Sequence, residues 1–168
     1  MHRTLVALVA LCIGTNTPAQ AAGCGQTLGA ENLAHLIKPI TASEKNLNDH
    51  VHTLADEMRP LTGVAFDRAE VEFNHMRMAL DSATHLRSKL LLIRNLVIIR
   101  DQMLDRRDRL LLESYLSVYA NEARSVSRIE YEAATGLLGK LSRPGFAVEV
   151  GQYRDAASAA ANALQSCE

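Results

Sequence analysis

The sequence has no tryptophan, and its aromatic content is only 4%. A core built from this chain must therefore consist mainly of Leu, Ile, Val, Ala and Met side chains. Neither sign of charge dominates, because 18 Lys and Arg residues stand against 19 Asp and Glu residues. This balance lacks the basic surface that is expected of a nucleic-acid-binding protein. With 168 residues, 48% of them hydrophobic, the composition is typical of one globular domain.

The apolar run from Leu5 to Ile13 is about half of the roughly 20 residues that a membrane-spanning helix needs. It follows a short basic start, and it precedes Ala19-Gln20-Ala21, which has small residues at the two positions that signal peptidase reads. We therefore interpret residues 1–21 as a secretory signal peptide and residues 22–168 as a single exported domain without a transmembrane segment. The expected location is the bacterial periplasm.

Cysteine is scarce, with three residues in the chain. Cys12 lies within the predicted signal peptide, which leaves Cys24 and Cys167 at opposite ends of the mature chain. An even pair in an oxidising compartment predicts a disulfide bond. The absence of a Cys-x-x-Cys motif argues against a redox centre. A lipid anchor on Cys24 is the alternative, although the preceding residues lack the usual leucine of a lipobox.

Glycine and proline are absent from the 72 residues between Gly63 and Gly136. Such a stretch, rich in Ala, Leu, Glu and Arg, favours helix. One straight helix of that length would span about 108 Å, so the chain must fold back at least once. The expected turns lie near Asp101 and at the capping-box spacing Ser127–Glu130.

Apolar residues at alternating steps of three and four predict several helices. A first helix over 33–58 should end before Pro60 and kink or break at Pro39. The apolar residues of 90–99 spread past one helix face, so we expect that part to be the most deeply buried. The fold class predicted is all-α, an antiparallel bundle of four to five helices clipped by the terminal disulfide. The other expected segments are 69–97, 102–124, a short helix over 128–140, and 146–167.

Sequence motifs for catalysis and cofactor binding are missing. A Cys-x-x-Cys-His motif for covalent haem, a Gly-x-Ser-x-Gly elbow and a Gly-rich phosphate loop do not occur. The acid pairs Glu70/Glu72 and Glu130/Glu132 are two residues apart, hence on nearly opposite sides of a helix, and are interpreted as solvated charges. The chain is therefore expected to have no catalytic residues and no cofactor.

A cluster of His and Met residues gives the alternative function, metal binding. His52, His75, Met78 and His85 fall at the end of one predicted helix and the start of the next. His75, Met78 and His85 are spaced for one helix face, and imidazole with thioether would suit copper. The competing interpretation is that these are solvated surface histidines, because no His-x-x-x-His spacing occurs.

The charged run 100–109 mixes signs, and the spacing of Asp105 and Arg109 predicts an ion pair on an exposed helix face. Its arginines could dock an acidic partner, or peripherally a membrane, and Tyr115, Tyr119 and Arg124 are further contact candidates. The sequence thus favours a secreted or periplasmic interaction protein. It would be an accessory component of an envelope assembly or an inhibitor of the immunity type, and its partner would be another envelope or secreted protein.

Overall fold

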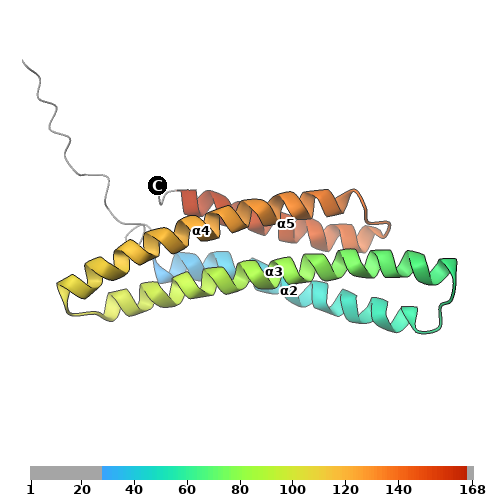
Figure 1. Ribbon diagram of the computed structural model, residues 1–168, viewed down its shortest axis with the longest axis horizontal. Helices are drawn as coiled ribbons and strands as arrows, with labels where there is room; N and C mark the ends of the chain where they lie inside the picture. The colour runs from blue at the N-terminus through green and yellow to red at the C-terminus, as the bar shows by residue number, and fades with distance from the viewer. Residues whose placement is uncertain (1–27, 166–168) are drawn as a thin grey trace, which may run out of the picture.

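The computed structural model describes residues 28–165, a stretch that contains four α-helices and no β-strand. The helices lie side by side along one long axis (Figure 1). None of these four helices has the length and hydropathy that a membrane span requires. Their bounds are α2 Ala30–Met58, α3 Val64–Gln102, α4 Arg106–Leu138 and α5 Pro144–Leu164.

Each helix packs antiparallel to the next one, and α5 returns to pack on α2. The main contacts are therefore α2 with α3, α3 with α4, α4 with α5, and α2 with α5, whereas the diagonal contact of α3 with α5 is small. Short connections force this arrangement, because a loop of a few residues can only join antiparallel neighbours. The all-α bundle predicted from the sequence is confirmed, with four helices in the described residues.

The two ends of the bundle differ. At one end the α3–α4 hairpin extends past the start of α2 and the end of α5 (Figure 1). Leu28 and Gln165, the first and last described residues, lie at this same end because α2 and α5 are antiparallel. The predicted signal peptide and the predicted Cys24–Cys167 disulfide lie outside the described residues.

The core follows the apolar seams of the sequence. Leu33, Ile40, Leu47 and Leu54 of α2 are seven residues apart and fully buried. Burying a leucine or isoleucine side chain stabilises the fold by about 1.5–3 kcal/mol, so such a seam holds the bundle together. α2 continues through Pro39, which causes no break in the helix. The buried seam of α5 ends in small residues that allow close packing, and it consists of Phe146, Val150, Tyr153, Ala156, Ala157, Ala160 and Leu164.

Glycine and proline mark the helix boundaries, as expected. Pro60 follows the end of α2, and Pro144 is the first residue of α5, where its missing N–H costs nothing. Gly63 precedes α3 with a φ of 58°, in the left-handed region that only glycine adopts readily. These positions fix the α2–α3 and α4–α5 turns.

The α3–α4 turn falls at residues 103–105, close to the turn expected near Asp101. Asp105 caps α4, because its side chain accepts hydrogen bonds from the N–H groups of Arg107 and Asp108 at 2.7 and 3.1 Å. The predicted ion pair of Asp105 with Arg109 is therefore wrong. Arg109 instead donates from Nη2 to the carbonyl of Met103 at 2.6 Å, which fastens the turn.

The turn expected at Ser127–Glu130 is also wrong. Ser127 is fully buried within α4, and its hydroxyl donates to the carbonyl of Ala123 at 2.7 Å. A serine that bonds back to the residue four positions earlier continues a helix and leaves no hydroxyl to cap a new one. Residues 128–138 of the expected short helix are consequently the end of α4 and not a separate helix, and residues 139–140 belong to the following turn.

Candidate functional site

A groove lies on the outer side of the bundle, along the seam between α3 and α4. It encloses about 640 Å³, and Tyr153 of α5 forms part of its lining. Small residues on α4, among them Ala133, Ala134 and Gly136, leave this part of the seam hollow. Most of the lining is apolar, which is typical of a small-molecule site with a few placed polar groups.

The polar groups of the groove form one hydrogen-bonded network across three helices. Ser82 of α3 donates its hydroxyl to Oε2 of Glu130 on α4. Because that hydroxyl has a single proton, Tyr153 must be the donor in its 2.8 Å contact with Ser82. His85 lies 3.2 Å from Oε1 of Glu130 through its Nδ1, which must carry a proton to donate. Glu130 therefore accepts hydrogen bonds at both of its oxygens.

Burial sets the protonation state of Tyr153. Its side chain is fully buried, and burial raises the pKa of the phenol above its usual value because the charged form would lose water. The hydrogen bond with Ser82 lowers the pKa, and the nearby charge of Glu130 raises it further. Tyr153 is thus a neutral donor, and it is not placed to act as a base.

The interpretation as solvated charges is wrong for Glu72, which is buried, and for Glu130, whereas Glu70 and Glu132 are exposed as expected. The side chain of Glu130 is only 12% exposed. The sequence does hold a signal for this burial, because Glu130 continues the steps of three and four that run through the buried residues of α4. That seam consists of Leu116, Ala120, Ala123, Ser127, Ala134 and Leu137.

Nucleophilic catalysis does not fit the network. The hydroxyl of Ser82 bonds to Glu130 and Tyr153, so it is not directed at His85. A serine nucleophile needs a base at its hydroxyl, with the carboxylate orienting that base from behind. Here serine and histidine bind the same carboxylate, so the network positions Glu130.

The structure brings together two of the four candidate metal ligands. Met78 and His85 line the groove, whereas His52 is exposed on α2. His75 is partly buried on α3, and its Nδ1 makes no hydrogen bond within the described residues. No group of three or more His, Cys, Asp or Glu side chains in residues 28–165 is arranged to hold a metal ion. The three histidines therefore do not converge on one site.

His52 belongs to a charged stretch of α2. The pKa of the nearby Asp49 carboxyl is held below its usual value, first by the hydrogen bond from Lys45 at 2.7 Å and then by the charges of Lys45 and His52. All three side chains are exposed, so this stretch is a solvated helix face.

Farther along the same seam, toward the α3–α4 turn, lies an exposed apolar surface that we name the α3–α4 patch. Its residues are between 41% and 65% exposed. Leu92 and Ile99 continue the seven-residue spacing of Met78 and His85, which line the groove, and Tyr115 lies three such steps before Gly136 on the groove side of α4. The patch consists of Leu92 and Ile99 of α3 and Leu111, Tyr115 and Val118 of α4.

The patch corrects the expectation that residues 90–99 are the most buried part of the chain. Leu90, Ile93 and Val97 do face the core, but Leu92 and Ile99 face outward. The apolar residues spread past one face because they serve two surfaces. Among the other candidates, Tyr119 is half-buried against the core. Arg124 is partly buried and lines a separate cavity shared with α5.

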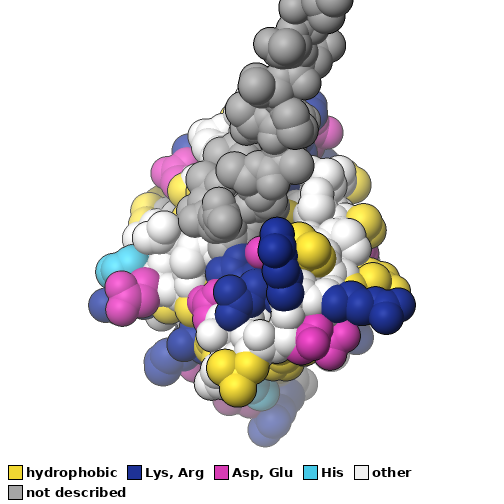
Figure 2. All heavy atoms as spheres, turned by 90° about the vertical axis from the view of Figure 1, so that its left-hand side faces the viewer, with side chains coloured by type: hydrophobic (Ala, Val, Ile, Leu, Met, Phe, Trp, Pro, Cys, Tyr) yellow, Lys and Arg dark blue, Asp and Glu magenta, His cyan; other side chains and the backbone are white. Residues whose placement is uncertain are grey.

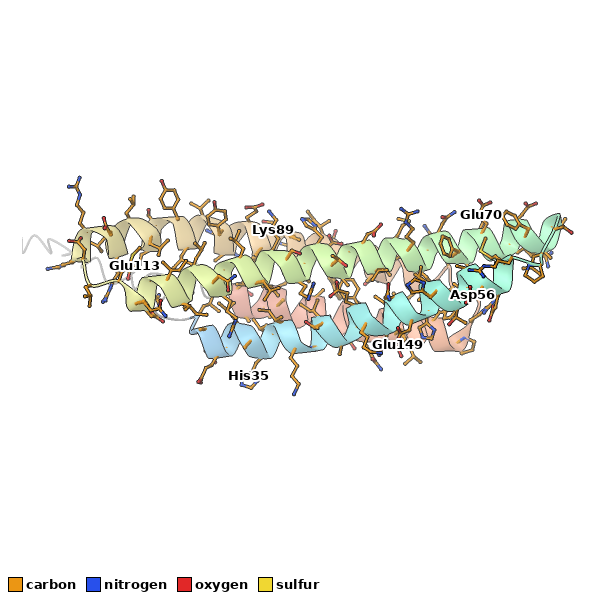
Figure 3. The ribbon with its side chains drawn as sticks, turned by 90° about the horizontal axis from the view of Figure 1, so that it is seen from below. His35, Asp56, Glu70, Lys89, Glu113 and Glu149 are labelled. Carbon is orange, nitrogen blue, oxygen red and sulfur yellow. The ribbon has the colours of Figure 1, made fainter. Side chains whose placement is uncertain are left out.

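The end of the hairpin adds apolar and cationic side chains to this surface. Leu104 in the turn is 100% exposed, and Arg106 and Arg107 are exposed beside it. Figure 2 shows this end of the bundle, where yellow hydrophobic and dark blue basic side chains project next to one another. At the opposite margin of the patch, Lys89, labelled in Figure 3, forms an ion pair with Glu122 across the seam. The patch is therefore apolar in its middle and charged at its margins.

Comparison of the chain with protein-family models, with curated proteins and with solved structures gave no match.

Proposed function

We propose that this protein is an exported, non-catalytic interaction protein that binds another envelope or secreted protein through the α3–α4 patch. The observation that carries the proposal is the row of five exposed apolar side chains along one helix–helix seam. A surface of this kind loses contact with water when a partner covers it, and apolar burial is the main favourable contribution to protein association.

The chemistry of the patch indicates the kind of partner. An apolar centre that includes Tyr115, with charged groups at its margin, has the composition of a protein–protein interface. Arg106 and Arg107 at the hairpin end favour a partner whose apolar strip ends in acidic side chains. Such a role suits an accessory component of an envelope assembly or an inhibitor of a secreted enzyme.

Site-specific photo-crosslinking in the native envelope tests this proposal. A photoreactive residue in place of Tyr115 should give one defined protein adduct, and the same residue in place of Val148, an exposed valine of α5, should not. With the adduct identified and purified, Val118→Ser should weaken binding by about tenfold, as expected for one interface contact. Val148→Ser is the matched control and should leave binding unchanged.

Two results would count against the proposal. Equal crosslinking from both positions would show that contact with the partner is not specific to the patch. Equal effects of the two serine variants on binding would show the same. Binding of the mature chain to lipid vesicles, lost in Val118→Ser, would replace the protein partner with a membrane surface.

Metal binding is the alternative proposal, and it is supported by the position of Met78 and His85 in one groove. The hydrogen bond of His85 Nδ1 to Glu130 leaves Nε2 as the nitrogen that is free to bind a metal ion. Calorimetric titration of the mature chain with copper and zinc tests this alternative. Stoichiometric binding that is lost in His85→Ala and retained in His52→Ala would support it.

A further inference from the structure

The groove contains a largely buried carboxylate whose counter-charge is incomplete. Among the glutamates of the described residues that form ion pairs, three have side chains that are less than 20% exposed. Glu44 lies 2.7 Å from Arg87, and Glu72 lies 3.0 Å from Arg143, so both face a permanent cation. Glu130 faces His85, which carries a positive charge only when it is protonated.

Burying a carboxylate without a cation is costly, because the charge loses its hydration and gains little in return. Among the described residues, the other members of this hydrogen-bond network are Ser82 and Tyr153, which are neutral and supply no positive charge. His85 is itself about half exposed, and both His85 and Glu130 line the groove. A carboxylate can accept about four hydrogen bonds, and Glu130 receives two within the described residues.

The rest of the groove limits the size and charge distribution of a cation that could bind there. Asp81 adds a second acidic side chain at the Glu130 end. The walls beyond are apolar and include Met78, Ala79 and Leu137. Lys140 also lines the groove, but it lies in the turn beyond Leu138, the last residue of α4, and Leu138 is about 12 Å from Glu130 along the helix axis. The groove is therefore acidic at one end, apolar in the middle and basic at the other end.

We propose that this groove binds a small organic amine, with its ammonium group against Glu130 and its apolar body along the α3–α4 seam. The ammonium group provides the permanent cation that Glu130 lacks and can donate to the free acceptor positions of the carboxylate. An apolar chain or ring shorter than about 12 Å covers the alanine-lined wall without passing the end of α4, beyond which Lys140 lies. A ligand with a second cation at the far end is disfavoured, because it would meet Lys140. This site is separate from the α3–α4 patch and does not depend on the interaction proposed above.

Binding of three matched six-carbon probes to the mature chain tests this site. Hexylamine is a cation at pH 7, hexanol is neutral and hexanoate is an anion, while their apolar chains are the same. Titrations followed by two-dimensional amide NMR should show hexylamine binding at least tenfold more tightly than hexanol, with hexanoate absent from the Glu130 end. The amide signals that move should be those of residues 78–85 and 130–140, which line the groove.

Two glutamine variants separate the site from general attraction of a cation to the protein. Glu130→Gln keeps the shape and one acceptor oxygen, which can receive the Ser82 hydroxyl, while the amide NH2 can donate to Nδ1 of His85 in its other tautomer. The variant removes the charge, so the preference for hexylamine over hexanol should disappear. Glu132→Gln removes the same charge from an exposed position two residues away and should preserve that preference. The amide spectrum of each free variant verifies that it is folded.

Three outcomes would overturn the proposal. The first is equal binding of hexylamine and hexanol by the unaltered chain. The second is a preference for hexylamine that survives in Glu130→Gln. The third is movement of amide signals of the α3–α4 patch in place of those of the groove.

Discussion

The hydroxyl of Tyr153 on α5 donates to the hydroxyl of Ser82 on α3, at 2.8 Å, in a bundle where these two helices otherwise make little contact. The pair joins the diagonal of the four-helix bundle. Ser82 in turn donates its hydroxyl to Glu130 of α4, so a single chain of hydrogen bonds joins three helices. A hydrogen-bond network that joins several helices specifies how they align, which uniform apolar packing does less well.

The first prediction concerns the stability of the protein at alkaline pH. Burial raises the pKa of Tyr153 in the folded state, whereas in the unfolded chain tyrosine ionises near its ordinary value of about 10. Above that value the folded state binds more protons than the unfolded state, so the free energy of unfolding falls as pH rises. The slope from this residue approaches about 1.4 kcal/mol per pH unit.

Urea denaturation between pH 8 and 11 measures this effect. Tyr153→Phe should reduce the free energy of unfolding by about 1 kcal/mol at pH 8, because it removes the donor to Ser82. The loss should shrink as pH rises, because the variant has no phenol to ionise at this position. Tyr131→Phe, which alters an exposed tyrosine, should follow the unaltered protein at every pH. Parallel stability curves for the unaltered protein and Tyr153→Phe would contradict the prediction.

The second prediction concerns Arg143, which ties the α4–α5 turn to the α2–α3 end of the bundle. Its guanidinium donates to Glu57 at 2.7 Å and lies 3.0 Å from Glu72. The hydrogen bond to Glu57 and the charges of both glutamates raise the pKa of Arg143. Glu72 is buried and also accepts from the N–H of Arg143 and the hydroxyl of Ser142, at 3.2 and 2.8 Å.

Arg143→Leu leaves Glu72 buried without its cation. Removing one partner of a buried pair costs about 3–5 kcal/mol, but Arg143 is itself partly exposed, so we expect a loss of about 2 kcal/mol. Arg154→Leu makes the same change at a position that pairs with the exposed Asp155, and it should cost less than about 1 kcal/mol. Urea denaturation at pH 7 compares the two variants. Equal losses would show that Glu72 is stabilised without Arg143.

The fold was predictable from the sequence because its main determinants are local and repetitive. Steps of three and four define each seam. Pro60 and Pro144 mark helix boundaries regardless of the tertiary contacts around them. The two sides of a helix are harder to distinguish when both are apolar. Leu90 and Leu92 have the same side chain, and only the position of α4 shows that the first is buried and the second exposed.

The groove could not be derived in the same way, because it depends on residues distant in sequence. Ser82 and Tyr153 are 71 residues apart, and Ser82 and Glu130 are 48 apart. The spacing within α3 places Met78 and His85 on one face, and both side chains line the groove. Nothing within α3 indicates which carboxylate of α4 lies opposite.

The third prediction contrasts two potential capping residues of α4. Asp105 accepts hydrogen bonds from two backbone N–H groups, so Asp105→Ala should destabilise the protein by about 1 kcal/mol. Ser127 lies within the helix and bonds back to Ala123, so Ser127→Ala should change the free energy of unfolding by less than about 0.5 kcal/mol. Thermal or urea denaturation of the two variants provides the measurement. A larger loss for Ser127→Ala than for Asp105→Ala would indicate that α4 begins at the second position.

The fourth prediction concerns the disulfide between Cys24 and Cys167. α2 and α5 are antiparallel neighbours, and Leu28 and Gln165 lie at the same end of the bundle. A bond between residues a few positions beyond each would close a loop of more than 100 residues, which stabilises by up to about 5 kcal/mol in the chain-entropy treatment. The intact mass of the exported protein should therefore lie two hydrogens below that of the reduced mature chain, and reduction should lower its melting temperature.

Serine variants decide whether the two cysteines act as a pair. If they are bonded to each other, Cys24→Ser, Cys167→Ser and the double variant should all lose the same stability, because each removes the single bond. Two independent thiols would give separate losses that add in the double variant. Reaction of the unreduced protein with iodoacetamide at both cysteines would contradict the bond, and a diacylglycerol adduct on Cys24 would replace it with a lipid anchor. Because a disulfide requires Cα atoms within about 4.4–6.8 Å, a confirmed bond would also fix the start of the mature chain against the end of α5.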